Sequence, residues 1–166
     1  MGASRDGCTA RATGSAGVRI YVASSWRNEF QPLVCAKLRE DGHDVYDFRH
    51  PEPGNNGFRW SDIDSLNDWK QWTIGQYLNA LTHPIAEHGF ALDVNALRAA
   101  DVCVYVMPCG VSASLEAGWA KGAGKPTSLY VPELREPDLM VKMFDLITDN
   151  LMVLRQWVQT YERRRD

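Results

Sequence analysis

Residues 100–126 read ADVCVYVMPCGVSASLEAGWAKGAGKP, and the remaining elements can be placed around this stretch. Its short unbroken apolar run, residues 102–107, is typical of a strand that helices cover on both faces. A turn signal follows at Pro108 and Gly110, and the small residues after it predict a helix that stops at Gly-Lys-Pro. Open parallel sheets bind ligands at the carboxyl ends of their strands. We therefore expect Glu116, in the first turn of this helix, to point into a ligand crevice.

The composition indicates one globular domain. The chain has 166 residues, of which 45% are hydrophobic, and this is enough for a sizeable core. The net charge is −3 and the basic run lies at residues 163–165, so we expect no nucleic-acid partner. No apolar stretch approaches the ~20 residues that span a bilayer, and no signal-peptide segment is present in residues 1–17. We expect a soluble, cytoplasmic protein without a membrane partner.

The cysteines give no sign of a metal site. They are Cys8, Cys35, Cys103 and Cys109, with no C-x-x-C pair and no histidine at ligand spacing. We expect reduced thiols, no metal and no cofactor.

Strands and helices alternate along most of the chain. Strands are predicted at residues 18–23, 44–48, 102–107 and 127–131, and helices at 28–41, 73–82, 86–99 and 111–124. The spacing of apolar residues after Pro137 predicts one closing amphipathic helix, or two that break around residues 148–150. This order predicts a doubly wound, Rossmann/flavodoxin-like three-layer sandwich with a parallel sheet of four or five strands. The domain is expected at residues 18–158, between a disordered tail at 1–17 and a basic tail at 159–166.

The loop after the first strand is a candidate anion site. Asn28 and Gln31 have the spacing of a capping box, which predicts that a helix begins here. The N–H groups of the loop and of the helix amino terminus favour a phosphate or a sugar hydroxyl. A plain connection between strand and helix is an equally good interpretation.

Residues 49–73 form a long segment rich in Pro, Gly and aromatic residues. Its tryptophans, Trp60, Trp69 and Trp72, have two interpretations: they stack on a base, or they pack as a helical cap or subunit interface. Packing is preferred. Downstream, Asp93 lies at the edge of a helical apolar stripe, where a hydrogen-bonded surface acid is the simplest interpretation. Because this helix leads into the strand before Glu116, we expect both carboxylates to reach one crevice.

From Val18 to about Trp157 the chain resembles the nucleoside 2-deoxyribosyltransferase-like superfamily, which includes nucleoside 5'-monophosphate N-glycosidases. The residues that carry the resemblance are Ile20-Tyr21 with Ser24-Ser25-Trp26, Asp93 with Ala100-Asp101, and Ser112 to Gly118 with Gly124-Lys125-Pro126. The Ser-Ser-Trp-Arg loop replaces a Gly-rich first loop. With the tryptophan-rich segment, it resembles a less characterised bacterial and phage branch.

The resemblance implies cleavage of the N-glycosidic bond of a (deoxy)nucleoside or its 5'-monophosphate, by hydrolysis or base exchange. It implies that Glu116 is the nucleophile, that Asp93 protonates the leaving base, and that Tyr21 orients Glu116. It suggests sugar or phosphate contacts from Ser24, Ser25, Trp26, Arg27, Gly110, Ser112 and Ser114. An ionised carboxylate below the glycosidic carbon stabilises an oxocarbenium ion or forms a covalent intermediate. The helix amino terminus is expected to keep Glu116 ionised.

Two other functions stay open. The first is a nucleotide-sugar sensor or a module that binds or cleaves NAD, because related α/β folds with a crevice glutamate do so. The second is a non-catalytic interaction protein in which Glu116 only caps its helix. The aromatic segment and the closing amphipathic helix predict a homodimer or higher homo-oligomer. In the resembled family a neighbouring subunit often completes the pocket.

Overall fold

The computed structural model describes residues 17–66 and 69–161. Its parallel sheet has five strands in the order β2-β1-β3-β4-β5, which are β1 (Arg19–Ala23), β2 (Asp44–Tyr46), β3 (Val102–Val106), β4 (Thr127–Tyr130) and β5 (Leu146–Thr148). The helices are α1 (Gln31–Glu40), α2 (Ile74–Leu81), α3 (Pro84–Ala99), α4 (Val111–Gly122) and α5 (Leu151–Gln159). This flavodoxin-like strand order confirms the predicted doubly wound sandwich. Residues 1–16 and 162–166 of the two predicted tails lie outside the described residues, and Gln159 of the second predicted tail belongs to α5.

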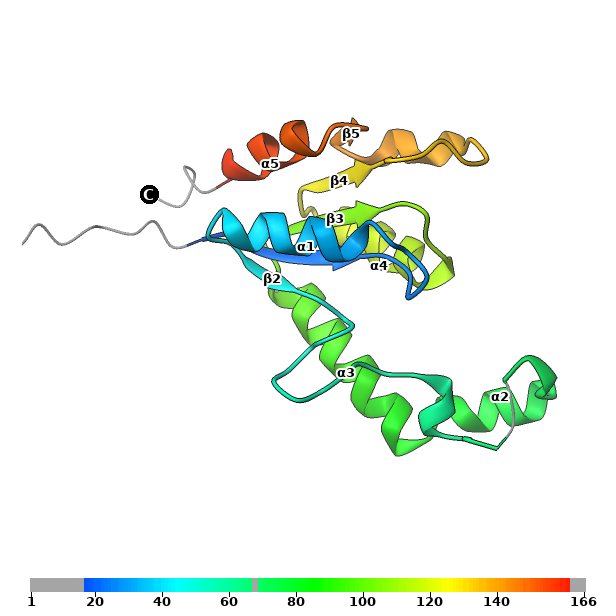
Figure 1. Cartoon of the computed structure of the whole chain (residues 1–166). Helices are drawn as coiled ribbons and strands as arrows, with labels where there is room; N and C mark the ends of the chain where they lie inside the picture. Colours follow the sequence, from blue (N-terminus) through cyan, green and yellow to red (C-terminus); the bar gives the residue numbers. More distant parts are fainter. Residues whose placement is uncertain (1–16, 67–68, 162–166) are drawn as a thin grey trace, which may run out of the picture.

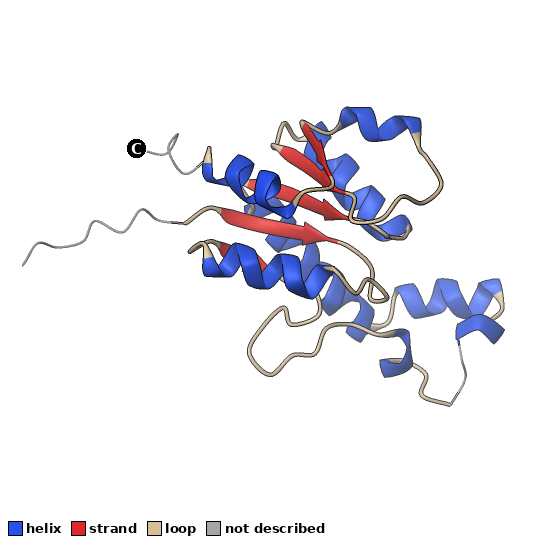
Figure 2. Cartoon of the chain, turned by 45° about the horizontal axis from the view of Figure 1, so that its top comes forward, coloured by secondary structure: helices blue, strands red, loops and turns tan. Residues whose placement is uncertain are grey.

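The sheet lies between two layers of helices (Figures 1 and 2). Helices α1 and α5 cover one face with Val34, Leu38, Leu154 and Val158. Helices α3 and α4 cover the other face, where the small side chains of Ala113, Ala117 and Ala120 bring α4 close to the strands. Alternate residues of β1 face opposite layers, so that Ile20 packs in the first cluster and Tyr21 in the second. The sheet thus directs Tyr21 towards the helix that carries Glu116.

Helix α1 begins at Gln31, three residues later than predicted, and its N-cap is Phe30 rather than Asn28. The Oδ1 atom of Asn28 accepts from the backbone N–H groups of Phe30 and Gln31 at 2.8 and 3.1 Å. The Gln31 side chain does not complete the box, because it donates instead to Asp47 Oδ1 at 2.8 Å. The predicted capping box of α2, between Thr73 and Gln76, is complete. Helix α3 begins two residues earlier than expected, since a proline is tolerated in a first turn.

The closing region differs from the prediction. Instead of a helix from residue 137, the structure has a 3-10 helix (Leu139–Met143), the edge strand β5 and then α5. The apolar residues of β5 fit the same three-and-four spacing as a helix, so the sequence pattern did not reveal the strand. Asp145 fixes the strand, because its Oδ2 atom accepts from the Thr127 N–H at 2.9 Å. Of the two helices in the second alternative, only the later one is present, as α5, and Asn150 caps it through the N–H of Met152.

The segment between β2 and α2 extends beyond the sheet (Figure 1). The ring of Trp60 packs edge-on against Phe58, Trp72 and Tyr77, with centroids 4.9 to 5.8 Å apart. The packing interpretation is therefore confirmed for Trp60 and Trp72. Phe58 also lies against Gly89 of α3, where an added Cβ would come within 2.8 Å of it. In the described part of the chain, every helix is too short or too polar to span a membrane.

Candidate functional site

Helix α4 places Glu116 beside the sheet. The strand β3 ends at Val106, a four-residue loop follows, and α4 begins at Val111. The helix buries its alanines against the strands, and Glu116 lies at the edge of that buried face, half-buried. Glu116 is the sixth residue of the helix, so the prediction that it lies in the first turn is wrong. The reason is that the helix starts directly after Gly110.

The protonation of Glu116 also differs from the expectation. The pKa of Glu116 is raised from its ordinary value of 4.5 to about 7, first by burial and second by the charge of Asp93. The field of a helix terminus falls off within the first turn, so it acts weakly on a second-turn carboxyl. Burial therefore outweighs the helix dipole, and near neutral pH the free protein contains both the neutral and the ionised form of Glu116.

Tyr21 is near both Tyr46 and Glu116. It is fully buried in β1, and its ring stacks on that of Tyr46 with centroids 5.4 Å apart and planes 15° apart. The two tyrosines are register partners on neighbouring strands. Among the described residues, the Tyr21 hydroxyl has no hydrogen-bond partner of regular geometry. It is nevertheless close enough to Glu116 to lower the pKa of that carboxyl.

Asp93 reaches the same region from α3. Its Oδ1 atom accepts a hydrogen bond from the Tyr46 hydroxyl at 2.8 Å. Burial raises the pKa of Asp93, and the bond from Tyr46 opposes that change. The charge of Asp93 contributes to the raised pKa values of Glu116 and Tyr21. The structure thus brings together Glu116, Asp93 and Tyr21.

Tyr46 was missed in the sequence. A tyrosine in a short strand is an ordinary β-forming residue, and the sequence does not reveal the register that pairs it with Tyr21. A usable signal would have been its place at the end of the second strand, where side chains meet the ligand edge of a parallel sheet.

A partly apolar cavity of about 250 Å³ opens beside Asp93. Its wall residues include Phe48, Phe58, Leu92 and Asp93, with the polar side chains of Asn55, Asp62 and His88. Asp93 therefore belongs both to this cavity and to the carboxylate pair. The segment after β2 and the helix α3 form opposite walls, which gives the long segment a place in the site.

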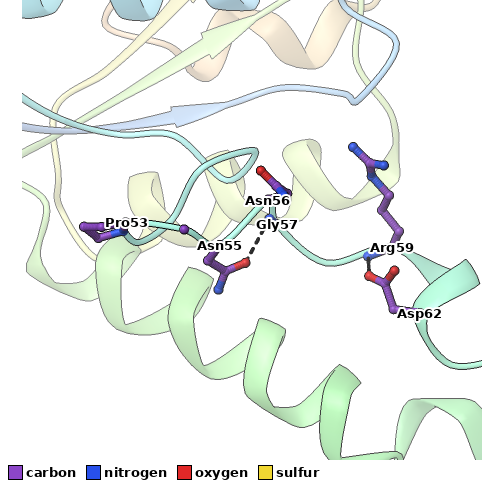
Figure 3. Close-up of a pocket in the computed structure, with 7 residues that line it drawn as sticks. Pro53, Asn55, Asn56, Gly57, Arg59 and Asp62 are labelled. Carbon is purple, nitrogen blue, oxygen red and sulfur yellow. Dashed lines mark hydrogen bonds between the residues drawn. The ribbon is translucent and has the colours of Figure 1, made fainter.

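A larger and more polar depression adjoins this cavity (Figure 3). It has a volume of about 570 Å³ and shares Asn55, Gly57 and Asp62 with the cavity. Gly57 has a φ of +74°, and a Cβ there would lie 2.3 Å from the Phe48 carbonyl oxygen. Only glycine fits this close approach of the loop to the end of β2. Arg59 borders the depression, with its guanidinium 4.9 Å from the Trp26 ring centroid.

Most of the serines predicted to contact the substrate make hydrogen bonds within the protein. The buried Ser24 hydroxyl donates to the Val106 carbonyl at 2.9 Å, and Ser25 Oγ accepts from the Arg27 N–H at 3.3 Å. Ser114 shares a hydrogen bond of 2.9 Å with the hydroxyl of Tyr105. Ser24 and Ser114 therefore serve the scaffold in this structure.

The anion site predicted at α1 is partly occupied, because Asn28 already accepts from the N–H groups of Phe30 and Gln31. Helix α4 is different: its amino-terminal residue Gly110 is exposed and, in the described chain, no side chain caps it. Ser112 is exposed in the same first turn, and Trp26 and Arg27 are exposed on the loop after β1. The free helix amino terminus of the site is therefore that of α4.

Among residues 17–66 and 69–161, no group of three or more His, Cys, Asp or Glu side chains is arranged to hold a metal ion. The site consists of two half-buried carboxylates and two stacked tyrosines, near the carboxyl ends of strands in a doubly wound sheet. The class is thus an α/β protein in which two carboxylates from different helices lie near two stacked tyrosines of the sheet, and one of them, Asp93, lines a cavity.

No protein family and no curated protein matches this sequence. Among solved structures, the chain is similar to a 2-deoxyribosyltransferase from Bacillus psychrosaccharolyticus, with 19% identity, 82% of this chain and 89% of that chain covered, and a TM-score of 0.49. It is also similar to the CMP N-glycosidase BcmB of Clostridium botulinum (16% identity, 86% and 98% covered, TM-score 0.44). A third is a conserved protein from Enterococcus faecalis V583 (14% identity, 88% and 99% covered, TM-score 0.48). At these values the likeness is one of fold alone.

Proposed function

We propose that this chain cleaves the N-glycosidic bond of a nucleoside or nucleoside 5'-monophosphate, with Glu116 as the nucleophile. One observation carries the proposal: Glu116 and Asp93, from different helices, are half-buried close enough together that the charge of Asp93 raises the pKa of Glu116. Two acidic groups with unequal surroundings beside a cavity are suited to divide the roles of nucleophile and acid.

The chemistry follows from these positions. The ionised carboxylate of Glu116 attacks the glycosidic carbon, the bond to the base nitrogen breaks, and a glycosyl ester forms. Asp93 gives a proton to the leaving base, which avoids the release of an anion. Water or a second base then attacks the ester and frees Glu116. The buried hydroxyl of Tyr21 is available to orient Glu116.

The cavity beside Asp93 is suited to the leaving base. The faces of Phe48, Phe58 and Leu92 offer apolar contacts to a flat ring, and Asn55 and His88 offer polar groups to its edge. This position supports Asp93, rather than Glu116, as the proton donor, because Asp93 lines the cavity.

The uncapped amino terminus of α4 supports contacts to the sugar or to a 5'-phosphate. Its backbone N–H groups, with Gly110 and Ser112 exposed, favour an oxyanion or a hydroxyl oxygen. Arg27 is exposed on the facing loop and would add positive charge for a phosphate.

The test is a chromatographic assay for free base with nucleosides, 2'-deoxynucleosides, 5'-monophosphates and NAD. We expect base release by the wild-type protein, its loss in Glu116→Ala, and its retention in Glu29→Ala, which changes an exposed glutamate. Release of nicotinamide from NAD alone would favour the NAD-cleaving alternative. No release from any compound by the folded wild type would contradict the proposal and favour an interaction protein.

We also propose that the chain forms a homo-oligomer. On α4, the residues Val111, Leu115 and Trp119 are spaced by four and are 77%, 69% and 44% exposed. These three residues, here called the α4 outer stripe, form an apolar surface on the same helix that carries Glu116. A second copy that covers this stripe would lie beside the site.

A further inference from the structure

Tyr21 of β1 and Tyr46 of β2 each approach one carboxyl of the site, those of Glu116 and Asp93. The Tyr46 hydroxyl donates to Asp93 at 2.8 Å, while the hydroxyl of Tyr21 lies near Glu116. The two rings are stacked and their residues are register partners, so neither ring can turn without disturbing the other. Tyr46 thus holds one member of the carboxylate pair from a fixed position in the sheet.

A phenol that donates to a carboxyl oxygen stabilises the ionised form of that carboxyl. Asp93 has such a donor in Tyr46. The hydroxyl near Glu116 is that of Tyr21, and it makes no hydrogen bond of regular geometry with a described residue. Both carboxyls are half-buried, and the two charges repel each other. At pH values between the first and the second ionisation, Asp93 and Glu116 together hold one proton. Because Tyr46 stabilises ionised Asp93, it favours the state in which this proton is on Glu116.

We propose that Tyr46 is a positioning residue that fixes the Asp93 carboxylate and keeps it ionised in the free protein, so that the proton of the pair resides on Glu116. This inference rests on the proposed function for its use in catalysis. When a substrate enters, the proton moves from a Glu116 oxygen to the other oxygen of Asp93. It leaves on the base nitrogen as the glycosidic bond breaks, and Asp93 returns to the ionised form that Tyr46 stabilises. One proton therefore serves the whole step, and no further donor is needed.

Other ionisable groups face Asp93 as well. Glu116 approaches it from α4 and Tyr21 from β1, while His88 of its own helix and Asp62 of the long segment line the same cavity. The charge of Glu52 acts on Tyr46. These groups stay in place when only the Tyr46 hydroxyl is removed, so a Tyr46→Phe substitution isolates its effect.

The test is an NMR titration of the side-chain carboxyl carbons in the free protein, assigned with Asp93→Asn and Glu116→Gln. In Tyr46→Phe, which keeps the ring, we expect the midpoint of Asp93 to rise by about one pH unit, a tenfold change in proton affinity. The midpoint of Glu116 should fall, because Asp93 is then neutral over more of the range. Tyr105→Phe is the matched control, since Tyr105 is half-buried and bonds to Ser114 instead; it should shift neither midpoint.

An unchanged Asp93 midpoint in folded Tyr46→Phe would overturn the inference, as would a wild-type protein in which Asp93 titrates above Glu116. If Tyr46→Phe does not fold, 3-fluorotyrosine at position 46 replaces it. The fluorinated phenol is a stronger donor, so it should lower the Asp93 midpoint, and no change would be the negative result. Because the titration needs no substrate, it is independent of base release. Failure of the proposed function would appear as no base released by the wild type, whatever the titration gives.

Discussion

The division of roles between Asp93 and Glu116 depends on what each side chain contacts. Asp93 lines the cavity proposed for the base, and Glu116 lies on the helix whose uncapped amino terminus we propose as the contact to the sugar. Some bases are cationic in the nucleoside and leave as neutral molecules without being protonated. A carboxyl whose role is to protonate the leaving base is needed less for such substrates.

Asp93→Asn should therefore be sensitive to the leaving group. With a neutral base such as adenine or cytosine, we expect kcat/KM to fall by about 10² to 10⁴. With an already cationic base, such as 7-methylguanine, the loss should be about tenfold or less. The measurement is kcat/KM for both kinds of nucleoside with the wild type and the variant. Equal losses for both would show that Asp93 does not donate the proton.

The raised pKa of Glu116 also predicts how stability depends on pH. A buried acid whose folded pKa lies above its unfolded value binds its proton more tightly when folded, so stability is lost as pH rises from about 4.5 to about 7. Glu116→Gln removes this loss. At pH 8 we expect the variant to be more stable by about 2 to 3 kcal/mol, and at pH 4.5 to show little gain.

Urea unfolding of the two proteins at both pH values measures this difference. Glu29→Gln is the control, because Glu29 is exposed. A gain at pH 4.5 equal to that at pH 8 would mean that ionisation of Glu116 is not its cause.

At the site, the sequence predicted that Glu116 and Asp93 lie near each other, but it did not predict the protonation of Glu116. Glu116 follows a strand that ends at the ligand edge, and Asp93 precedes that strand, so local patterns suffice to bring them near each other. The pKa of Glu116 depends on burial and on the charge of Asp93 from another helix, neither of which is local in sequence. Tyr46 requires the register between β1 and β2, which no pattern in the chain specifies.

Among the elements, the loop after β1 depends most on one side chain. Asn28 is 1% exposed, donates to the carbonyls of Val106 and Pro108 at 2.8 and 3.0 Å, and accepts from the N–H groups of Phe30 and Gln31 just before and at the start of α1. It thereby joins the first loop to the loop before α4. The capping-box spacing predicted a helix after Asn28, but it gave no sign of these long-range bonds, because they depend on β1 and β3 lying side by side.

Asn28→Ala should cost about 2 to 4 kcal/mol of stability, since it removes the side-chain hydrogen bonds to the Pro108 carbonyl and to the N–H groups of Phe30 and Gln31. It should also lower base release, because the loop before α4 loses its support. The matched control is Asn95→Ala, an exposed residue in the interior of α3. Denaturant unfolding and the base-release assay check both effects. A loss of less than about 1 kcal/mol would mean that water replaces these bonds.

The element order was predictable from alternating apolar runs and turn signals, except near the carboxyl end. There β5 is short, lies at the sheet edge and is only partly buried, so its residues carry neither strict alternation nor a buried run. The order of neighbours in the sheet determines that this segment is a strand, because β4 offers it a free edge.

For the whole molecule, the α4 outer stripe predicts self-association. Leu115→Lys should weaken it and reduce the mass measured by light scattering, because a charge would be buried at the contact. Leu134→Lys is the control, since Leu134 is 85% exposed on the loop after β4. A wild-type protein that is monomeric at working concentration would contradict this prediction.

The account as a whole rests on Glu116 as the nucleophile of an N-glycosidic cleavage. The most direct measurement is kcat/KM for base release from the best substrate of the panel, with wild type, Glu116→Gln and Glu29→Gln compared at the same pH. We predict a loss of about 10³-fold or more in Glu116→Gln and none in Glu29→Gln. A folded Glu116→Gln protein that retains activity within about tenfold of the wild type would contradict the account.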